Sequence, residues 1–257
     1  MEETQLGRRV FFVAPPSVVQ DQLIDLLIQG EFEVSIVKKP QAVFTLVNQF
    51  PYGIFFLNTE APLVDKYSSW DDIIDEMRKL NPQETIRIGV LGYNTSPEMA
   101  KHFLIDKEVE CGYIQLKLGL AQTAKILLKT LEINEARGRR KFIRVPGIPG
   151  KNSLSIRTTQ RLLEGTLMDI STAGMAVILN DQNNLLSSDE SLDDIQLRLW
   201  GSLFTVKARL MGKRMVQGKG MVHVLLFDPP IEGPAKLKLH SYIKRVIQQE
   251  TDQASVR

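Results

Sequence analysis

The stretch RGRRKFIRVPGIPG at residues 137–150 divides the chain into two parts with different hydrophobic patterns. Its prolines and glycines interrupt regular backbone structure, so the helical pattern before it cannot continue. Short apolar runs alternate with helical patterns on the N-terminal side, whereas short strand-like segments follow one another on the C-terminal side. With 257 residues the chain is long enough for two cores. We therefore expect domains at 1–134 and 151–257, joined by a linker at 135–150.

Composition limits the class of protein. Hydrophobic residues make up 43% and charged residues 24% of the chain, which is typical of a folded, water-soluble protein. The one cysteine, Cys111, excludes an internal disulfide and a thiolate zinc cage, which favours a reducing compartment. No apolar stretch approaches the roughly 20 residues of a membrane helix. We expect a cytoplasmic protein with no membrane span, no metal and no cofactor.

Charge is distributed unevenly along the chain. Residues 1–134 carry 13 basic and 18 acidic side chains, a net charge of −5. Residues 135–257 carry 19 basic and 12 acidic side chains, a net charge of +7. An anionic partner should therefore bind the second half.

The first half alternates between predicted strands and helices. Five short runs rich in β-branched and aromatic residues are typical of buried parallel strands. These runs are Val10–Ala14, Val34–Val37, Gly53–Leu57, Ile86–Leu91 and Gly112–Leu116. Helical patterns follow the first three runs and the last. This alternation predicts an α/β fold with a doubly wound parallel sheet.

The order and spacing of these segments resemble the receiver domain of two-component response regulators over about the first 130 residues. Phosphoryl transfer to a receiver needs an aspartate nucleophile and further carboxylates that hold magnesium. Here Ala14–Pro16 replace the acidic pair, Asn58 replaces the phosphorylated aspartate, and Gly92 or Tyr93 replaces the switch hydroxyl. Lys117 matches the receiver's lysine with the spacing changed by one residue. We expect a pseudo-receiver that serves packing or partner contact; an α/β core without any regulatory role is the alternative.

An acidic cluster is the one candidate metal site in the first half. It consists of Asp65, Asp71, Asp72, Asp75 and Glu76. Carboxylates at a helix start also interact favourably with the helix dipole, and we favour this second interpretation.

The second half predicts a small antiparallel barrel followed by an amphipathic helix. Turn residues separate six alternating segments. These segments are Ser153–Thr158, Gly165–Ile170, Met175–Leu179, Ile195–Trp200, Leu203–Leu210 and Met221–Phe227. The helix is expected at Ala235–Gln249, where apolar residues recur on one face.

Two motifs in this half together resemble the PilZ domain, the bacterial receptor module for the second messenger cyclic di-GMP. Arg140–Arg144 matches the R-x-x-x-R that precedes the family's six-stranded barrel, and Asp169–Gly174 matches its D/N-x-S-x-x-G. The resemblance covers about residues 137–250. It implies a non-enzymatic signal-transduction protein that binds cyclic di-GMP and controls motility, biofilm or virulence through an unidentified protein partner.

The motif chemistry fits this ligand. A guanidinium pairs bidentately with a phosphate or with the acceptor edge of guanine, so Arg140 and Arg144 are the first candidate contacts. Arg139 precedes the motif and is a weaker candidate; at this position the family's residue influences whether one nucleotide or an intercalated pair binds. A surface basic patch is the structural alternative.

The second motif supplies the candidate base reader. Asp169 can accept hydrogen bonds from the donors of guanine's Watson–Crick edge. Ser171 can donate to a phosphate or fix its loop, and Gly174 can allow a close approach of backbone. The alternative is that Asp169 and Ser171 only satisfy their own turn.

Other functional classes fit less well. The sequence contains no G-x-x-x-x-G-K-[ST], H-E-x-x-H or G-x-S-x-G, so we do not expect an enzyme. A nucleic-acid-binding regulator with a receiver-like domain and a basic output domain remains the main alternative. No helix-turn-helix or aromatic stacking series supports it, so nucleic acid is an unlikely partner.

Overall fold

The computed structural model describes residues 7–63, 67–94, 96–158, 161–180, 186–187 and 192–256. It divides into two compact units. The first unit comprises Met1–Lys141 together with Ile247–Arg257, and the second comprises Phe142–Val246. Among the described residues no helix is long and apolar enough to cross a membrane.

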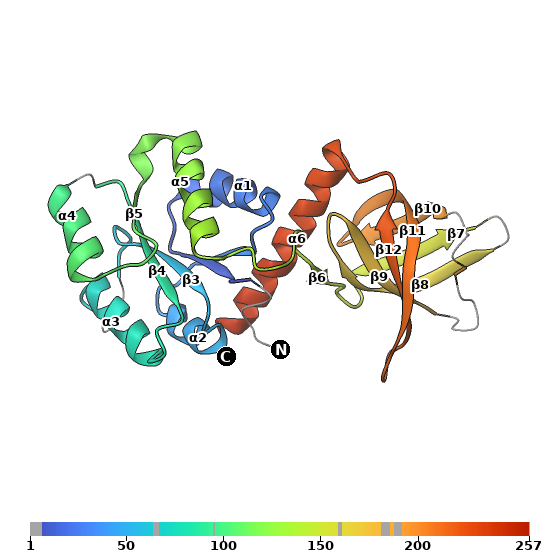
Figure 1. Cartoon of the computed structure of the whole chain (residues 1–257), viewed down its shortest axis with the longest axis horizontal. Helices are drawn as coiled ribbons and strands as arrows, with labels where there is room; N and C mark the ends of the chain where they lie inside the picture. Colours follow the sequence, from blue (N-terminus) through green and yellow to red (C-terminus); the bar gives the residue numbers. More distant parts are fainter. Residues whose placement is uncertain are drawn as a thin grey trace. The chain divides into compact units, whose positions relative to one another are not determined.

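A five-stranded parallel sheet forms the centre of the first unit (Figure 1). Its strand order is β2-β1-β3-β4-β5, which places β2 and β5 at the edges. The strands are β1 (Val10–Val13), β2 (Val34–Val37), β3 (Ile54–Asn58), β4 (Arg87–Gly92) and β5 (Tyr113–Gln115). β1 and β3 are fully buried, as strands covered on both faces must be. The predicted parallel α/β sheet is confirmed.

Helices cover both faces of this sheet. One group of helices that contact one another consists of η2 (Val19–Leu23), α1 (Ile24–Gln29) and α5 (Leu120–Ile133). A second group consists of α2 (Ala42–Gln49) and α3 (Trp70–Leu80), which contact each other. A further helical segment was not predicted: α4 (Pro97–Lys101) continues into η3 (His102–Asp106). Between β5 and α5 lies the short turn η4 (Leu116–Leu118).

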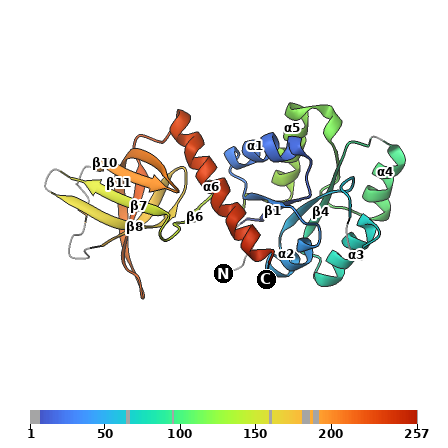
Figure 2. The same cartoon turned by 180° about the vertical axis from the view of Figure 1, so that it is seen from behind.

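The second unit is an antiparallel barrel (Figure 2). Its strands are β7 (Asn152–Arg157), β8 (Leu162–Ile170), β9 (Gly174–Leu179), β10 (Leu192–Leu199), β11 (Ser202–Val216) and β12 (Gly220–Phe227). They pair in the order β8-β7-β10-β11-β12-β9, and pairing of β9 with β8 closes the ring. The predicted six-stranded barrel is confirmed. A seventh strand, β6 (Val145–Pro146), adds to β8 from within the stretch that the sequence assigns to the linker.

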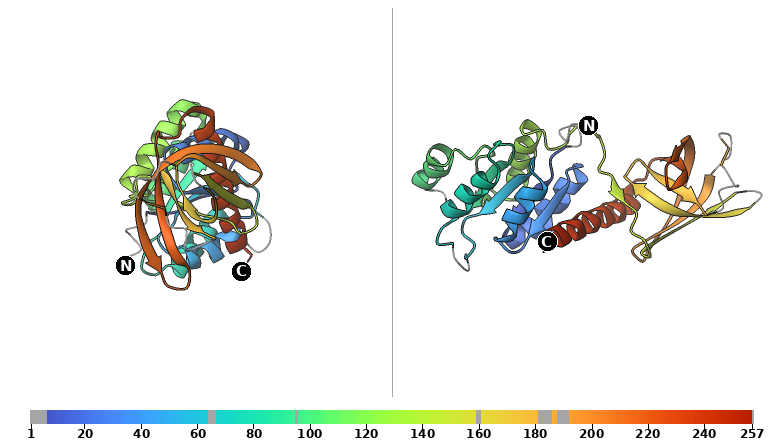
Figure 3. Two further views of the ribbon diagram at one scale, coloured as in Figure 1. Left: turned by 90° about the vertical axis from the view of Figure 1, so that its right-hand side faces the viewer. Right: turned by 90° about the horizontal axis from the view of Figure 1, so that it is seen from below.

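The C-terminal helix α6 runs from Gly233 to Ala254, longer than predicted. Its earlier part belongs to the barrel unit, where the Arg245 guanidinium lies 3.8 Å from the centre of the Trp200 ring. From Ile247 onward it belongs to the first unit, and Figure 3 shows this end of the helix, in red, beside the first strands, in blue.

Candidate functional site at the β6–β8 junction

β6 brings the second arginine of the R-x-x-x-R motif to the aspartate of the second motif. Val145 pairs with Ile170 and Pro146 with Asp169. Arg144, directly before β6, therefore reaches Asp169, and its Nε lies 3.5 Å from Asp169 Oδ1. The Arg144 side chain is 47% exposed and that of Asp169 25% exposed. A solvent-exposed ion pair contributes little to the free energy of folding. Arg144 can therefore exchange Asp169 for another anion at a small cost in free energy.

Two backbone features allow β6 to lie so close to β8. The Gly147 N–H donates to the Met168 carbonyl at 2.9 Å, and a Cβ on Gly147 would meet the Leu167 carbonyl oxygen. β8 is also irregular between Leu167 and Asp169, where its register with β9 shifts. Sequence reasoning treated Gly147 only as a helix breaker, although a glycine after Pro146 is also a signal for close backbone approach.

Ser171 and Gly174 shape the turn between β8 and β9. The Ser171 N–H donates to the Gly174 carbonyl at 2.9 Å, and the Ser171 hydroxyl reaches the same oxygen at 3.2 Å. The hydroxyl also accepts from the Ala173 N–H at 3.3 Å, and Ser171 is 5% exposed. A Cβ on Gly174 would lie 2.2 Å from the Leu225 carbonyl oxygen. These contacts support the structural roles of Ser171 and Gly174 and leave Asp169 as the accessible side chain.

The other two candidate arginines belong to the first unit. Arg139 and Arg140 are exposed and precede the boundary after Lys141. The chain leading to them is held in place: Arg137 donates to the Gly30 carbonyl at 2.8 Å and lies 4.6 Å from the Phe32 ring centre. The structure thus groups Arg144, Asp169, Ser171 and Gly174 in one unit, and the R-x-x-x-R motif spans the boundary.

At the carboxyl end of the parallel sheet, Asn58 has a structural role. Asn58 is 8% exposed; its Nδ2 donates to the Ala14 carbonyl at 2.8 Å, and its Oδ1 accepts from the Glu60 N–H at 3.2 Å. Glu60 in turn accepts from the N–H groups of Tyr93 and Asn94. Where a receiver carries its reactive groups, this protein thus has hydrogen bonds that join the loops after β1, β3 and β4.

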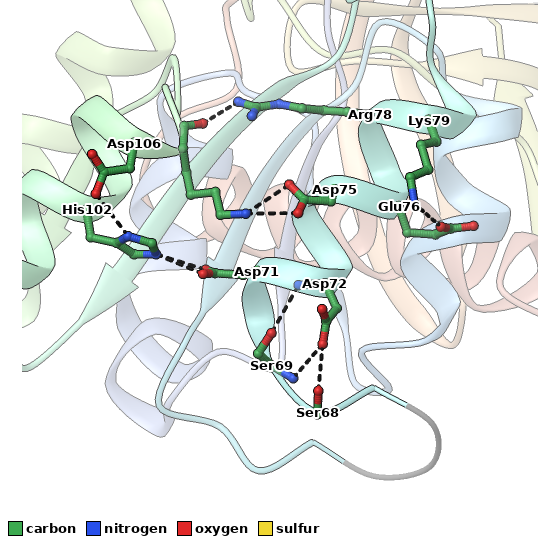
Figure 4. Close-up of polar contacts among 11 residues, drawn as sticks. Ser68, Ser69, Asp71, Asp72, Asp75, Glu76, Arg78, Lys79, His102 and Asp106 are labelled. Atoms are coloured by element: carbon green, nitrogen blue, oxygen red, sulfur yellow. Dashed lines mark hydrogen bonds and ion pairs between the residues drawn. The ribbon is translucent and has the colours of Figure 1, made fainter.

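The acidic cluster is engaged in ion pairs and a helix cap (Figure 4). Asp72 forms a capping box with Ser69 at the start of α3. Asp71 lies 2.9 Å from His102 Nε2, and Asp75 accepts from Lys107 Nζ at 2.9 Å. Asp65 lies outside the described residues, and among those described no group of three His, Cys, Asp or Glu side chains is arranged to hold a metal ion.

The His102 ring is flanked by two carboxylates, which changes its titration. Asp71 raises the pKa of His102, and Asp106, 3.3 Å from Nδ1, adds to this effect against partial burial of the ring. The Asp71–His102 pair joins α3 to η3, and the raised pKa means that His102 keeps its proton to a higher pH than an ordinary histidine.

Comparison with known proteins identifies similar solved structures but no similar sequence family. No family model and no curated protein matches the sequence. Among solved structures, YcgR of Escherichia coli in complex with c-di-GMP is 18% identical with a TM-score of 0.37, covering 47% of this chain and 51% of that one. MotI (DgrA), the inhibitor of motility of Bacillus subtilis, is 20% identical with a TM-score of 0.36, covering 42% of this chain and 50% of that one.

A second set of matches consists of receiver domains. The isolated receiver domain of RcsB from Salmonella enterica serovar Typhimurium is 18% identical with a TM-score of 0.41, covering 52% of this chain and 95% of that one. The chain spans about half the length of the YcgR and MotI chains that it matches. Its fold is established by its own strand order and pairing.

Proposed function

We propose that the protein is a cyclic di-GMP receptor without catalytic activity, in which the β6–β8 junction binds the nucleotide. The observation that carries this proposal is the half-exposed ion pair between Arg144 and Asp169 beside the turn at 171–174. Arg144 offers a guanidinium to a phosphate or to the guanine O6 and N7 atoms, and Asp169 offers a carboxylate to the guanine N–H donors. One exposed pair thus holds both groups that recognition of a guanine nucleotide requires.

Arg140 completes the proposed site from the other end of the motif. It is exposed, so its guanidinium is accessible to a second phosphate. Binding would then order residues 135–150 against the loop at 169–174 and change the orientation of the domains, which a protein partner reads. We infer control of motility, biofilm or virulence, in line with the name of MotI, an inhibitor of motility.

Calorimetric titration with cyclic di-GMP and cyclic di-AMP tests this function. The wild-type protein should bind cyclic di-GMP and discriminate against the adenine nucleotide, because adenine lacks the donor pattern that Asp169 accepts. Arg144→Ala should weaken binding about 30-fold or more, as loss of a charge-assisted contact of about 2–4 kcal/mol implies.

A matched control is available within the barrel. Arg157 on β7 forms an exposed pair with Asp194 at 3.7 Å, so Arg157→Ala removes a comparable ion pair away from the β6–β8 junction. This variant should bind like the wild type. Wild-type affinity in Arg144→Ala, or an equal loss in both variants, would refute the proposed site.

A further inference from the structure

β11 and β12 form a two-stranded ribbon that extends beyond the other strands of the barrel (Figure 1). β10 pairs with β11 only as far as Ala208, and β9 pairs with β12 only from Val222 onward. Among the described residues, β11 after Ala208 and β12 before Val222 therefore pair only with each other. We call the projecting end, residues 211–221, the ribbon tip.

Charge on this hairpin is of one sign. Residues 202–227 include five Lys or Arg side chains and no Asp or Glu. Near the barrel, carboxylates from outside the hairpin offset two of these cations. Lys207 Nζ lies 3.2 Å from Asp193 Oδ1, and Arg209 Nε lies 3.7 Å from Asp228 Oδ2.

The ribbon tip carries the other three cations. Lys213 Nζ donates to the Leu186 carbonyl at 3.0 Å, a neutral partner that leaves its charge in place. Arg214 and Lys219 are exposed and form no ion pair within the described part of the chain. Positive charge that is balanced beside the barrel is thus unbalanced at the tip, which should attract an anionic surface.

Exposed methionines accompany these charges. Met211 and Met215 are 59% and 69% exposed, and Met215 lies opposite Met221 in the pairing of β11 with β12. A methionine side chain is apolar and flexible, so it can pack in an irregular apolar layer. The tip therefore suits a surface that is anionic outside and apolar beneath.

A lipid surface fits this combination better than a nucleic acid or a protein. The tip has no aromatic side chain on which bases could stack, and a duplex presents mainly phosphates along its outside. A stable protein interface buries about 800 Å² on each partner, a flat area that a narrow projection does not offer. The headgroup layer of a membrane can surround such a projection on both faces.

We propose that the ribbon tip binds an anionic lipid surface, where Lys213, Arg214 and Lys219 contact the headgroup phosphates. The Met215 side chain enters the boundary between headgroups and acyl chains, while the cationic groups stay at the phosphate level. This inference does not depend on the nucleotide site. Each cation near an anionic membrane strengthens binding roughly 5-fold, so the association is reversible, needs anionic lipid and weakens with salt.

Co-sedimentation of the full-length protein with vesicles tests the lipid surface. The wild type should bind phosphatidylcholine vesicles that contain about 30% phosphatidylglycerol, and should not bind pure phosphatidylcholine. Arg214→Ala should weaken binding to the mixed vesicles about 5-fold. Lys207→Ala is the matched control: it removes the same charge from the same hairpin, but at a position paired with Asp193, and should bind like the wild type.

A fluorescent label tests whether the tip itself enters the lipid. The label is attached to Met215→Cys; the native Cys111 is buried, with its thiol pKa raised to about 12, so it should remain unlabelled. Mixed vesicles should shift the emission at position 215 to shorter wavelength. A label on Leu203→Cys, an exposed position at the opposite end of β11, should show no shift.

The alternatives give different results. Absence of binding to mixed vesicles, or equal binding to both kinds of vesicle, would overturn the proposal. An equal loss in Arg214→Ala and Lys207→Ala, or unshifted emission at position 215 in vesicle-bound protein, would remove the tip from the contact. Duplex DNA or polyglutamate that bound more tightly than the mixed vesicles, with the same dependence on Arg214, would assign the tip to a nucleic acid or an acidic protein instead.

Discussion

A Cβ atom on Gly147 would lie 2.0 Å from the carbonyl oxygen of Leu167. Real Cβ atoms do not approach a backbone oxygen this closely, so only glycine allows β6 to rest on β8 at this point. The separation matters for the site, because β6 is the element that holds Arg144 beside Asp169.

Gly147→Ala should therefore separate β6 from β8. We expect a loss of about 1–3 kcal/mol in the free energy of unfolding and weaker binding of cyclic di-GMP, measured by denaturant titration and calorimetry. Gly212→Ala is the control, since a Cβ there meets no atom within 4 Å. Equal stability and affinity in the two variants would contradict this role of Gly147.

Asp169→Ala distinguishes a nucleotide receptor from a nucleic-acid regulator. The substitution should weaken cyclic di-GMP binding and slightly strengthen nonspecific DNA binding, because it removes a negative charge from a basic half of the chain. Both ligands are titrated at two salt concentrations. The nucleotide has two phosphates, so its affinity should fall far less with salt than that of a duplex. Nanomolar, sequence-specific DNA binding whose affinity does not change with cyclic di-GMP would favour the nucleic-acid-binding regulator.

His102 should make stability depend on pH. Asp71 and Asp106 raise its pKa in the folded protein above the ordinary value of 6.5. While both aspartates stay ionised, the ion pairs are therefore fully formed below pH 6.5, and their contribution is lost as pH rises through the folded-state pKa. Thermal unfolding of wild type and His102→Gln, compared across this range, should show a difference that shrinks toward high pH. A constant difference would contradict the assignment.

The first unit should not accept a phosphoryl group. Asn58 presents an amide, bonded to the Ala14 carbonyl and the Glu60 N–H, where a receiver needs a free carboxylate. After incubation with acetyl phosphate and magnesium, the intact mass should be unchanged, with a phosphorylatable receiver domain as the positive control. A stable phosphoryl adduct within residues 1–134 would refute the pseudo-receiver interpretation.

Most strands were predictable because their signal is local. Val34–Val37 was predicted with its observed limits, since a buried strand needs only a short β-branched run. The helix at 97–106 was missed for the opposite reason. Leu104 and Ile105 are 47% and 61% exposed, so the apolar positions of this helix do not mark a buried face.

Other features depend on contacts that periodicity cannot reveal. β6 is two residues long and contains Pro146, so it has no alternation to detect, and its existence follows from pairing with β8. The end of α6 is held by the polar side chains of Gln248 and Thr251 against residues more than two hundred positions earlier. Of the candidate site, the two motifs indicated the residues, whereas the 3.5 Å contact of Arg144 with Asp169 follows from the pairing of β6 with β8.

The amide of Asn58 also determines what a single substitution at this position can achieve. An aspartate at position 58 would remove the donor that satisfies the Ala14 carbonyl and set a negative charge against that oxygen, in a position that is 8% exposed. The acidic pair would still be absent at Pro15 and Pro16. Asn58→Asp alone therefore costs stability without supplying the other carboxylates that phosphoryl transfer needs.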